Sequence, residues 1–402
     1  MQKLVVSRDD TVYEAFADVA QGPDGTLVCT YRESLAHAPA PFSRIIVRRS
    51  EDGGMSWRPR QVVIEKDDTK GEGRLNCSRI TACADGTLLL VVDFFPPGRG
   101  EWQENPCENL LFRSTDSGRT WTGPQETGIQ DGVVPAIKEL ANGDLLIGVT
   151  RMRMPKNMDW RQALKHGTEE QTVYISSDKG RRWEGPFAVP GVGRLRLNEG
   201  DFAQLDDGTV VCYMREDAEK LSGWKSISRD GGRTWCEPIR TEMFSCRGRP
   251  SVGRLRSGEV LVTYRFCSGV STSLALYMET AEEALRVEPP DPTKYDSEYK
   301  AGRFAFIDND RSLHPDSGYS GWVQLPSGSL YVVNYITDDA PMAQIRGYLL
   351  SREDFYLFPE GDIRWLHPAH GRPYVEQTAE MARKQFQENR RRDWSKRVPT
   401  QK

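Results

Sequence analysis

The sequence predicts an all-β fold, a six-bladed β-propeller followed by a C-terminal helical tail. Two periodic patterns along its 402 residues support this prediction. A motif of the form Ser-x-Asp-x-Gly-x-x-Trp occurs four times, at residues 50–57, 114–121, 176–183 and 228–235. Six short turns that end in Gly lie between apolar stretches, and a β-rich run follows each of them. Because a blade is one four-stranded sheet, we expect one blade for each turn.

The four Trp-containing motifs are typical of tight turns. Their Trp residues are 64, 62 and 52 residues apart, which suits one four-stranded sheet per repeat. Asp and Gly fit a hairpin turn, and Ser and Asp side chains can accept hydrogen bonds from its backbone amides. We expect the motifs to identify the fold and to carry no chemistry, with degenerate counterparts near residues 277–283 and 351–355. The Trp side chains are expected on the outer rim: Trp57, Trp121, Trp183 and Trp235.

The six turns set the number of blades. They end at Gly25, Gly86, Gly143, Gly208, Gly258 and Gly328, and the residue before each is Asp, Asn or Ser. This is hairpin chemistry, and it predicts a propeller over residues 1–372. The segment EQTAEMARKQFQENRRRDW is charged and rich in helix formers, so residues 373–402 are predicted to be a helical tail. Its Arg run fits a solvated helix face, and nucleic-acid binding is the alternative.

The composition excludes several classes of protein. A net charge of −4 gives no basic field for nucleic acid, and no apolar run approaches the length of a membrane span. Eight scattered Cys with no CxxC pair argue against a disulfide scaffold and a zinc site, and no metal or cofactor is expected. The first residues lack the apolar core of a signal peptide, which predicts a cytoplasmic protein, or a secreted one if a signal was trimmed. The sequence does not give the oligomeric state.

Counting a fixed number of residues from each turn glycine identifies positions that are expected to reach the axis. Nine residues before each Gly, the blades carry Phe16, Cys77, Val134, Glu199, Arg249 and Tyr319. Seven residues after it, they carry Arg32, Asp93, Thr150, Arg215, Arg265 and Tyr335. Polar residues that recur at one height in a closed ring of blades predict a common pocket.

Two segments at these heights resemble stretches of the sialidases (exo-α-neuraminidases). NEGDFAQLDDGTVVCYMR, at 198–215, is similar to the stretch that holds a Glu and an Arg sixteen residues apart. GYSGWVQLPSGSLYVVNY, at 318–335, is similar to the one that holds their catalytic Tyr. The resemblance implies that Tyr319 is a nucleophile activated by Glu199, and that Arg215 grips an anionic group of the substrate. The alternative is an internal ion pair beside a buried Tyr.

The sequence departs from the sialidase pattern at several places. VYEAFADV, at 12–19, lacks the first of the three arginines that hold the sialic acid carboxylate, and Tyr335 stands where a Glu braces that arginine. The third arginine is also missing, and Arg249 or Arg265 could replace it. The loop at 32–44 lacks the family's acid/base Asp. Its titratable candidates are Glu33 and His37, of which His37 is the better proton donor.

These observations predict an exo-acting glycoside hydrolase of the sialidase superfamily. Its substrate would be a glycan with a terminal, acidic sugar that need not be ordinary sialic acid. Arg32, Arg79 and Asp93 are expected to add substrate contacts. A non-catalytic glycan-binding propeller is the main alternative, and a polysaccharide lyase that uses Tyr and His is a third possibility.

Overall fold

A computed structural model describes residues 1–38, 41–98, 107–130, 132–153, 167–269, 271–287 and 303–355. Contacts divide the chain into two units, and the first, residues 1–290 with 301–352, contains all six sheets. The other unit, residues 291–300 with 353–402, lies almost wholly outside the described residues, and so does the predicted helical tail at 373–402.

Each sheet of the first unit has four strands, which are consecutive in the chain in five sheets, while β1 joins β22, β23 and β24 in the sixth. Blade 1 consists of β2 (Tyr13–Gln21), β3 (Leu27–Ser34), β4 (Phe42–Ser50) and β5 (Gln61–Asp67), followed by the 3-10 helix η1 (Asp68–Lys70). Blade 2 consists of β6 (Arg74–Ala82), β7 (Leu88–Phe95), β8 (Glu108–Ser114) and β9 (Thr122–Glu126). Blade 3 consists of β10 (Val133–Glu139), β11 (Leu145–Arg153), β12 (Thr168–Ser176) and β13 (Glu184–Ala188).

The remaining blades follow the same plan. Blade 4 consists of β14 (Leu197–Gln204), β15 (Val210–Glu216), β16 (Ser222–Ser228) and β17 (Ile239–Phe244). Blade 5 consists of β18 (Ser251–Arg254), β19 (Val260–Ser268), β20 (Ser271–Glu279) and β21 (Arg303–Asn309), with α2 (Ala281–Ala284) between the last two. Blade 6 consists of β22 (Ser317–Gln324), β23 (Leu330–Ile336), β24 (Gln344–Leu350) and β1 (Gln2–Ser7), and α3 (Arg352–Phe355) follows β24.

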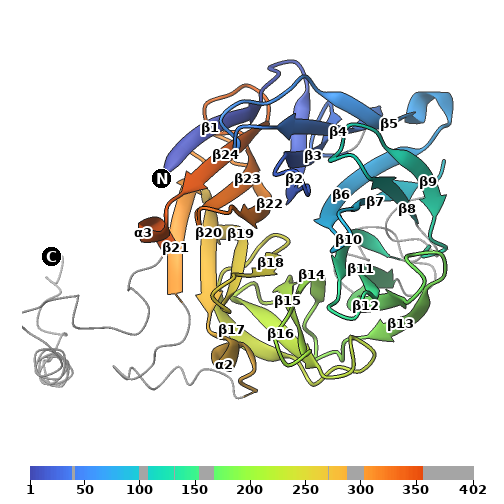
Figure 1. Ribbon diagram of the computed structural model, residues 1–402, viewed down its shortest axis with the longest axis vertical. Helices are drawn as coiled ribbons and strands as arrows, with labels where there is room; N and C mark the ends of the chain where they lie inside the picture. The colour runs from blue at the N-terminus through green and yellow to red at the C-terminus, as the bar shows by residue number, and fades with distance from the viewer. Residues whose placement is uncertain are drawn as a thin grey trace, which may run out of the picture. The chain divides into compact units, whose positions relative to one another are not determined.

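The six sheets surround one axis, which confirms the predicted propeller (Figure 1). The innermost strands β2, β6, β10, β14, β18 and β22 each contact the next, and β22 contacts β2, so the ring is closed. The N-terminal strand β1 pairs with β24 and completes blade 6. This pairing joins the first and last blades through backbone hydrogen bonds, a closure that the turn pattern alone does not reveal.

The core lies between neighbouring blades. The second strands β3 and β23 are buried along their whole length, because sheets on both sides cover them. Strands covered on both faces read as continuous apolar runs, which explains LVCTY and LLLVV after the turn glycines. One such cluster joins Val28 and Val47 of blade 1 to Leu88 and Leu90 of blade 2. All six turn glycines have positive φ, between 83° and 104°, as the predicted hairpins require.

The four Asp-boxes, as we call the Ser-x-Asp-x-Gly-x-x-Trp motifs, connect the third and fourth strands of blades 1 to 4. In blade 2 the Ser114 hydroxyl donates to Asp116 at 2.8 Å and accepts from the Gly118 amide at 2.9 Å. Asp116 accepts from the Thr120 amide at 2.9 Å. A Cβ on Gly118 would lie 2.9 Å from Val28 of blade 1, so the turn presses closely against the preceding blade. The boxes therefore dock neighbouring blades, as their structural interpretation requires.

Blade 5 has a short helix in place of an Asp-box. In blade 5, α2 follows the third strand, and the Thr280 hydroxyl accepts from the Glu283 amide at 3.1 Å in a capping box. In the chain, α3 follows β24, and most of it belongs to the other unit. Among the described residues, no helix has the length and apolar character that a membrane span needs. All eight cysteines are free.

Candidate active site

The ring residues nine positions before each turn glycine lie on interruptions of the innermost strands. The register of five of these strands shifts there, for example between Asn198 and Asp201 of β14. Four ring residues have positive φ: Phe16 at 63°, Val134 at 53°, Glu199 at 50° and Tyr319 at 48°. Such a backbone is unfavourable for residues other than Gly, and a bulge re-aims the side chain that it carries. The bulges therefore set the direction of the ring side chains.

Side chains of the second strands hold the bulges in place. The Glu199 amide donates to the Thr150 hydroxyl of the preceding blade at 2.7 Å. The Asp93 carboxylate accepts from the amides of Cys77 and of Val134, the latter at 3.0 Å. These residues lie at the predicted heights, and the structure gives Asp93 and Thr150 the task of fixing the backbone. Glu199 is consequently oriented before any ligand arrives.

Tyr319, Glu199 and Arg215 meet in one hydrogen-bonded group. The Tyr319 hydroxyl donates to Glu199 Oε1, and Arg215 Nη1 donates to the same oxygen at 2.9 Å. Arg215 also donates to Asp217 from Nε at 3.1 Å and from Nη2 at 2.8 Å. Glu199 Oε2 is buried and has no hydrogen-bond partner. The group thus joins a phenol to a carboxylate that keeps one oxygen available.

Burial determines the protonation state of Tyr319. Loss of contact with water raises the pKa of its hydroxyl well above the usual value, and the negative charge of Glu199 raises it further. Arg215 has the opposite, smaller influence on this pKa. The phenol is therefore protonated at neutral pH, and its oxygen can become a nucleophile only if an adjacent base takes the proton. Glu199 is in contact with that proton.

Arg249 is a buried cation that has no hydrogen-bond partner among the described residues. It lies just before β18, its side chain is fully buried, and Nε, Nη1 and Nη2 all lack hydrogen bonds. Its guanidinium carbon lies 4.7 Å from the centroid of the Tyr319 ring. Burial, together with the positive charge of Arg79, lowers the pKa of Arg249. A buried charge in this state is costly, so the position favours an anion beside Tyr319.

His37 belongs to a second polar group on the blade 1 side. Its Nδ1 lies 2.6 Å from Asp316 Oδ2, and Asp316 Oδ1 accepts from the Tyr335 hydroxyl at 2.9 Å. Burial alone would raise the pKa of Asp316, but the hydrogen bond and charge of His37, with smaller contributions from Tyr13 and Arg265, lower it to about 2. Asp316 is therefore a carboxylate at neutral pH. It anchors one ring nitrogen of His37, whose side chain is 55% exposed.

Phe16 lies between the two polar groups. Its ring centroid is 5.3 Å from that of His37 and 4.9 Å from that of Tyr319. The His37 imidazole and the Tyr319 phenol thus lie against the same aromatic side chain.

The chain is similar in sequence to proteins of a known family. Residues 25–286 match the family described as the BNR repeat-like domain, which is more than half of the chain. The chain belongs to the sialidase superfamily. A sialidase of Micromonospora viridifaciens is 29% identical over 233 residues, which cover 53% of this chain and 34% of that protein. The match therefore spans about a third of the curated relative's length.

Solved structures share the fold of this sialidase superfamily member. A Dyadobacter fermentans protein of unknown function has a TM-score of 0.70 at 19% identity, covering 87% of this chain and 98% of that one. A Hadza microbial sialidase has a TM-score of 0.64 at 16% identity, covering 88% and 69%. The intramolecular trans-sialidase from Ruminococcus gnavus, solved with oseltamivir carboxylate, has a TM-score of 0.61 at 12% identity, covering 86% and 96%.

Three predicted contact residues bind other protein groups in this sialidase superfamily member. Arg79 is 3% exposed and binds Asp18 and Asp201 nearer the hairpin-turn end of the axis. Asp93 is fully buried on the bulge amides, as described above. Arg32 is also fully buried, and its guanidinium donates to the backbone carbonyls of Ala36 and His37. All three side chains thus have protein partners in the structure, and their contact with substrate stays a prediction.

Two further candidates, Arg265 and Glu33, also have protein partners. Arg265 donates to the carbonyls of Arg247 at 2.8 Å and Ser317 at 3.1 Å, and lies 3.5 Å from Asp316. Adjacent residues of a strand face opposite sides of the sheet. Glu33 follows Arg32 in β3, and its carboxylate forms an ion pair with Arg60.

Sequence reasoning missed Asp217 and Asp316. Asp217 stands two residues after Arg215, the spacing of one strand face, which is a weak signal that could have been used. Asp316 precedes β22 in a loop, and only the fold brings it to His37, 279 residues away in sequence. The described residues contain no cluster of His, Cys, Asp or Glu arranged to hold a metal ion.

Proposed function

We propose that this protein is an exo-acting glycoside hydrolase that cleaves a terminal acidic sugar, with Tyr319 as nucleophile and Glu199 as its base. The observation that carries the proposal is the hydrogen bond from the buried Tyr319 hydroxyl to Glu199. Sialidases are the glycosidases that use a Tyr nucleophile, and the chain belongs to their superfamily. The same pairing would be of little use to a module that only binds glycans.

The reaction proceeds by two displacements. The Tyr319 oxygen forms a bond to the anomeric carbon while the bond to the leaving oxygen breaks, and the phenol proton passes to Glu199 Oε1. Water then attacks the anomeric carbon of the tyrosyl–sugar intermediate, and Tyr319 leaves and recovers its proton. Arg215, bound to Glu199 and Asp217, keeps the carboxylate aimed at the phenol throughout. Two inversions at one carbon retain its configuration.

His37 is the proposed proton donor to the leaving oxygen. Asp316 holds Nδ1, which directs Nε2 away from Asp316 and leaves it to exchange a proton with the substrate. In the second displacement the same nitrogen takes a proton from the attacking water. The imidazole of His37 and the ring of Tyr319 both contact Phe16, which supports this role.

The proposed substrate carries an anionic group because Arg249 needs a partner. Its three guanidinium nitrogens lack hydrogen bonds, whereas Arg215 already donates to two carboxylates. A carboxylate on the sugar would form charge-assisted hydrogen bonds with Arg249 beside the reacting Tyr319. Because the sequence lacks the first of the sialidase arginines, we propose an acidic sugar other than ordinary sialic acid, such as another ulosonic acid or a uronic acid.

A panel of aryl glycosides tests the proposal. Tyr319→Phe keeps the ring but removes the attacking oxygen, so kcat should fall by several orders of magnitude on every substrate that the wild type hydrolyses. Glu199→Gln should be nearly as inactive, and the double variant only slightly worse, because base and nucleophile act as one unit. Near-normal turnover by Tyr319→Phe would refute the mechanism. Glycan binding by the wild type without turnover would favour a binding module instead.

A further inference from the structure

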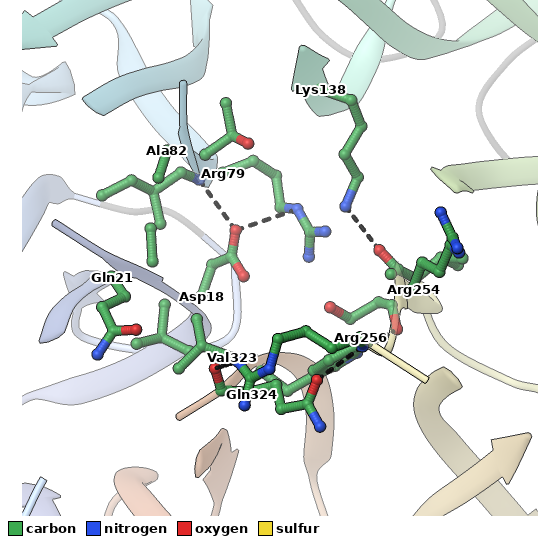
Figure 2. A pocket seen from close by; sticks show the side chains of 17 residues that line it. Asp18, Gln21, Arg79, Ala82, Lys138, Arg254, Arg256, Val323 and Gln324 are labelled. Atoms are coloured by element: carbon green, nitrogen blue, oxygen red, sulfur yellow. Dashed lines mark hydrogen bonds and ion pairs between the residues drawn. The ribbon is translucent and has the colours of Figure 1, made fainter. Parts of the chain in front are cut away.

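A cavity opens at the end of the propeller axis that carries the hairpin turns. It has a volume of about 500 Å³ and is lined by the innermost strands of blades 1, 2, 3, 5 and 6 (Figure 2). Its residues lie on the turn side of the bulges: Asp18 follows Phe16 by two positions, and Arg79 follows Cys77 by two. The cavity is therefore distinct from the Tyr319 group.

A buried ionic network forms the floor of this cavity. Arg79 lies 3.2 Å from Asp18 and also binds Asp201, and Lys138 lies 3.3 Å from Asp201. Lys138 also donates to the Val252 carbonyl at 2.6 Å, and Asp201 accepts from the Val252 amide at 2.7 Å. Two cations thus face two carboxylates, and the floor itself needs no further counter-ion. The network closes the axis between the two ends of the propeller.

The rim carries a cation without a carboxylate. Arg256 donates only to backbone carbonyls, to Gln324 at 3.2 Å and to the carbonyls of Leu325 and Pro326. No ion pair to it occurs in the described part of the chain. Because the floor is balanced, Arg256 leaves the cavity with a positive surplus. Figure 2 shows its side chain next to Gln324 along one wall.

Two further rim groups suit a hydroxylated ligand. Gln21 donates to the Gly25 carbonyl at 3.2 Å within its own turn, which leaves its amide oxygen to accept a hydrogen bond. The Trp322 indole is fixed by its bond to the Ser251 carbonyl at 3.1 Å and by Gly253, where a Cβ would lie only 2.8 Å away. A fixed aromatic ring, an amide acceptor and a guanidinium donor match the apolar faces, hydroxyls and carboxylate of a sugar acid.

We propose that this cavity is a second ligand site, which binds a small sugar acid with its carboxylate at Arg256. The volume lies within the range of small-molecule pockets, about 300–1,000 Å³. The ligand would replace water on Arg256, and its hydroxyls would meet Gln21 and Lys138 at the wall and floor. The site does not depend on the reaction proposed for Tyr319, because none of its lining residues contacts Tyr319, Glu199 or Arg215 through a hydrogen bond or ion pair.

Isothermal titration calorimetry with D-glucuronate, D-glucose and inorganic phosphate tests this site. The wild type should bind glucuronate at millimolar concentration or better, and bind glucose at least about tenfold more weakly. Arg256→Gln removes the proposed anchor, and Gln21→Glu places a repelling carboxylate at the rim. Each should weaken glucuronate binding at least about tenfold. Arg182→Gln, which changes an exposed Arg of the blade 3 Asp-box, is the matched control and should leave this binding unchanged.

Gln21→Glu guards against a folding artefact, because Gln21 bonds only within its own turn and the melting temperature should be unaffected. Several results would overturn the proposal: no glucuronate binding by the wild type, or glucose binding of equal strength. Binding of phosphate without glucuronate would exclude a sugar acid. Loss of glucuronate binding in Arg215→Gln, with binding retained in Arg256→Gln, would assign the ligand to the Tyr319 pocket instead.

Discussion

Replacing Arg249 by Met should stabilise the free protein and weaken its affinity for an anionic substrate. The side chain is fully buried, and its guanidinium makes no hydrogen bond. Met fills a similar volume with an unbranched apolar chain, so the packing against the Tyr319 ring is largely kept. The change therefore isolates the charge, and the two effects have opposite signs.

The magnitude follows from the surroundings of Arg249. A buried charge costs several kcal/mol of desolvation, and cation–π attraction to the Tyr319 ring, 4.7 Å away, offsets about 2 kcal/mol of this. Removing the charge should therefore raise the free energy of unfolding by about 1–3 kcal/mol, which corresponds to a melting temperature roughly 1–4 °C higher in a chain of this size. Losing the contact to a buried substrate carboxylate should cost about 2 kcal/mol or more, a factor of roughly 30 in KM.

Arg265 provides the matched control, since it lies on the same blade and its guanidinium has hydrogen-bond partners. It donates to two backbone carbonyls and lies 3.5 Å from Asp316, so Arg265→Met leaves these groups unpaired and should destabilise the protein. Melting curves of both variants, with KM for the best acidic aryl glycoside, decide the matter. If Arg249→Met lowers the melting temperature as much as Arg265→Met does, the charge of Arg249 does not destabilise the free protein.

Three other perturbations have definite expected outcomes. Asp316→Asn and His37→Ala should both slow glycosides with poor leaving groups much more than activated aryl glycosides; equal losses on both substrates would remove His37 as proton donor. Burial raises the pKa of Glu14 to about 7 from 4.5, so unfolding free energy should fall by about 3 kcal/mol as pH rises through this window. Glu14→Gln should abolish that fall, as pH-dependent urea titrations would reveal. Gly118→Ala, with φ 77° and Val28 only 2.9 Å from the new Cβ, should cost about 2 kcal/mol in stability while kcat stays unchanged.

The fold could be predicted because its signals are local. A turn glycine with positive φ, an Asp or Asn before it and an apolar run after it depend on neighbouring residues alone, and so does the hydrogen bonding within an Asp-box. The turn pattern recurs six times and the Asp-box four times, which makes the repeat visible in the sequence. The closure of blade 6 by β1 left no such signal, because strands from the two ends of the chain pair there.

The site could be predicted only in part, because height and direction are separate properties. Counting from the turn glycines placed Glu199 and Tyr319 at one height, and the structure brings them into contact. The same count could not foresee that Arg79 binds Asp201, which lies 122 residues further along the chain. Nor could it show that the Asp93 carboxylate accepts hydrogen bonds from backbone amides. A buried charge finds its partner through the tertiary fold, and the sequence alone does not reveal that partner.

The distribution of charge around the ring orients the proposed substrate. Phe16 forms an aromatic wall on the blade 1 side, with its ring 4.9 Å from Tyr319 and 5.5 Å from Tyr335. The Phe16 ring itself offers no donor to a carboxylate, and the terminal nitrogens of Arg32 behind it already donate to Asn76 and to backbone carbonyls, whereas all three guanidinium nitrogens of Arg249 beside Tyr319 lack hydrogen bonds. A sugar held by Tyr319 at its anomeric carbon would therefore direct its acidic group towards blade 5. Its leaving group would then lie towards Phe16 and His37, the side on which a proton donor is required.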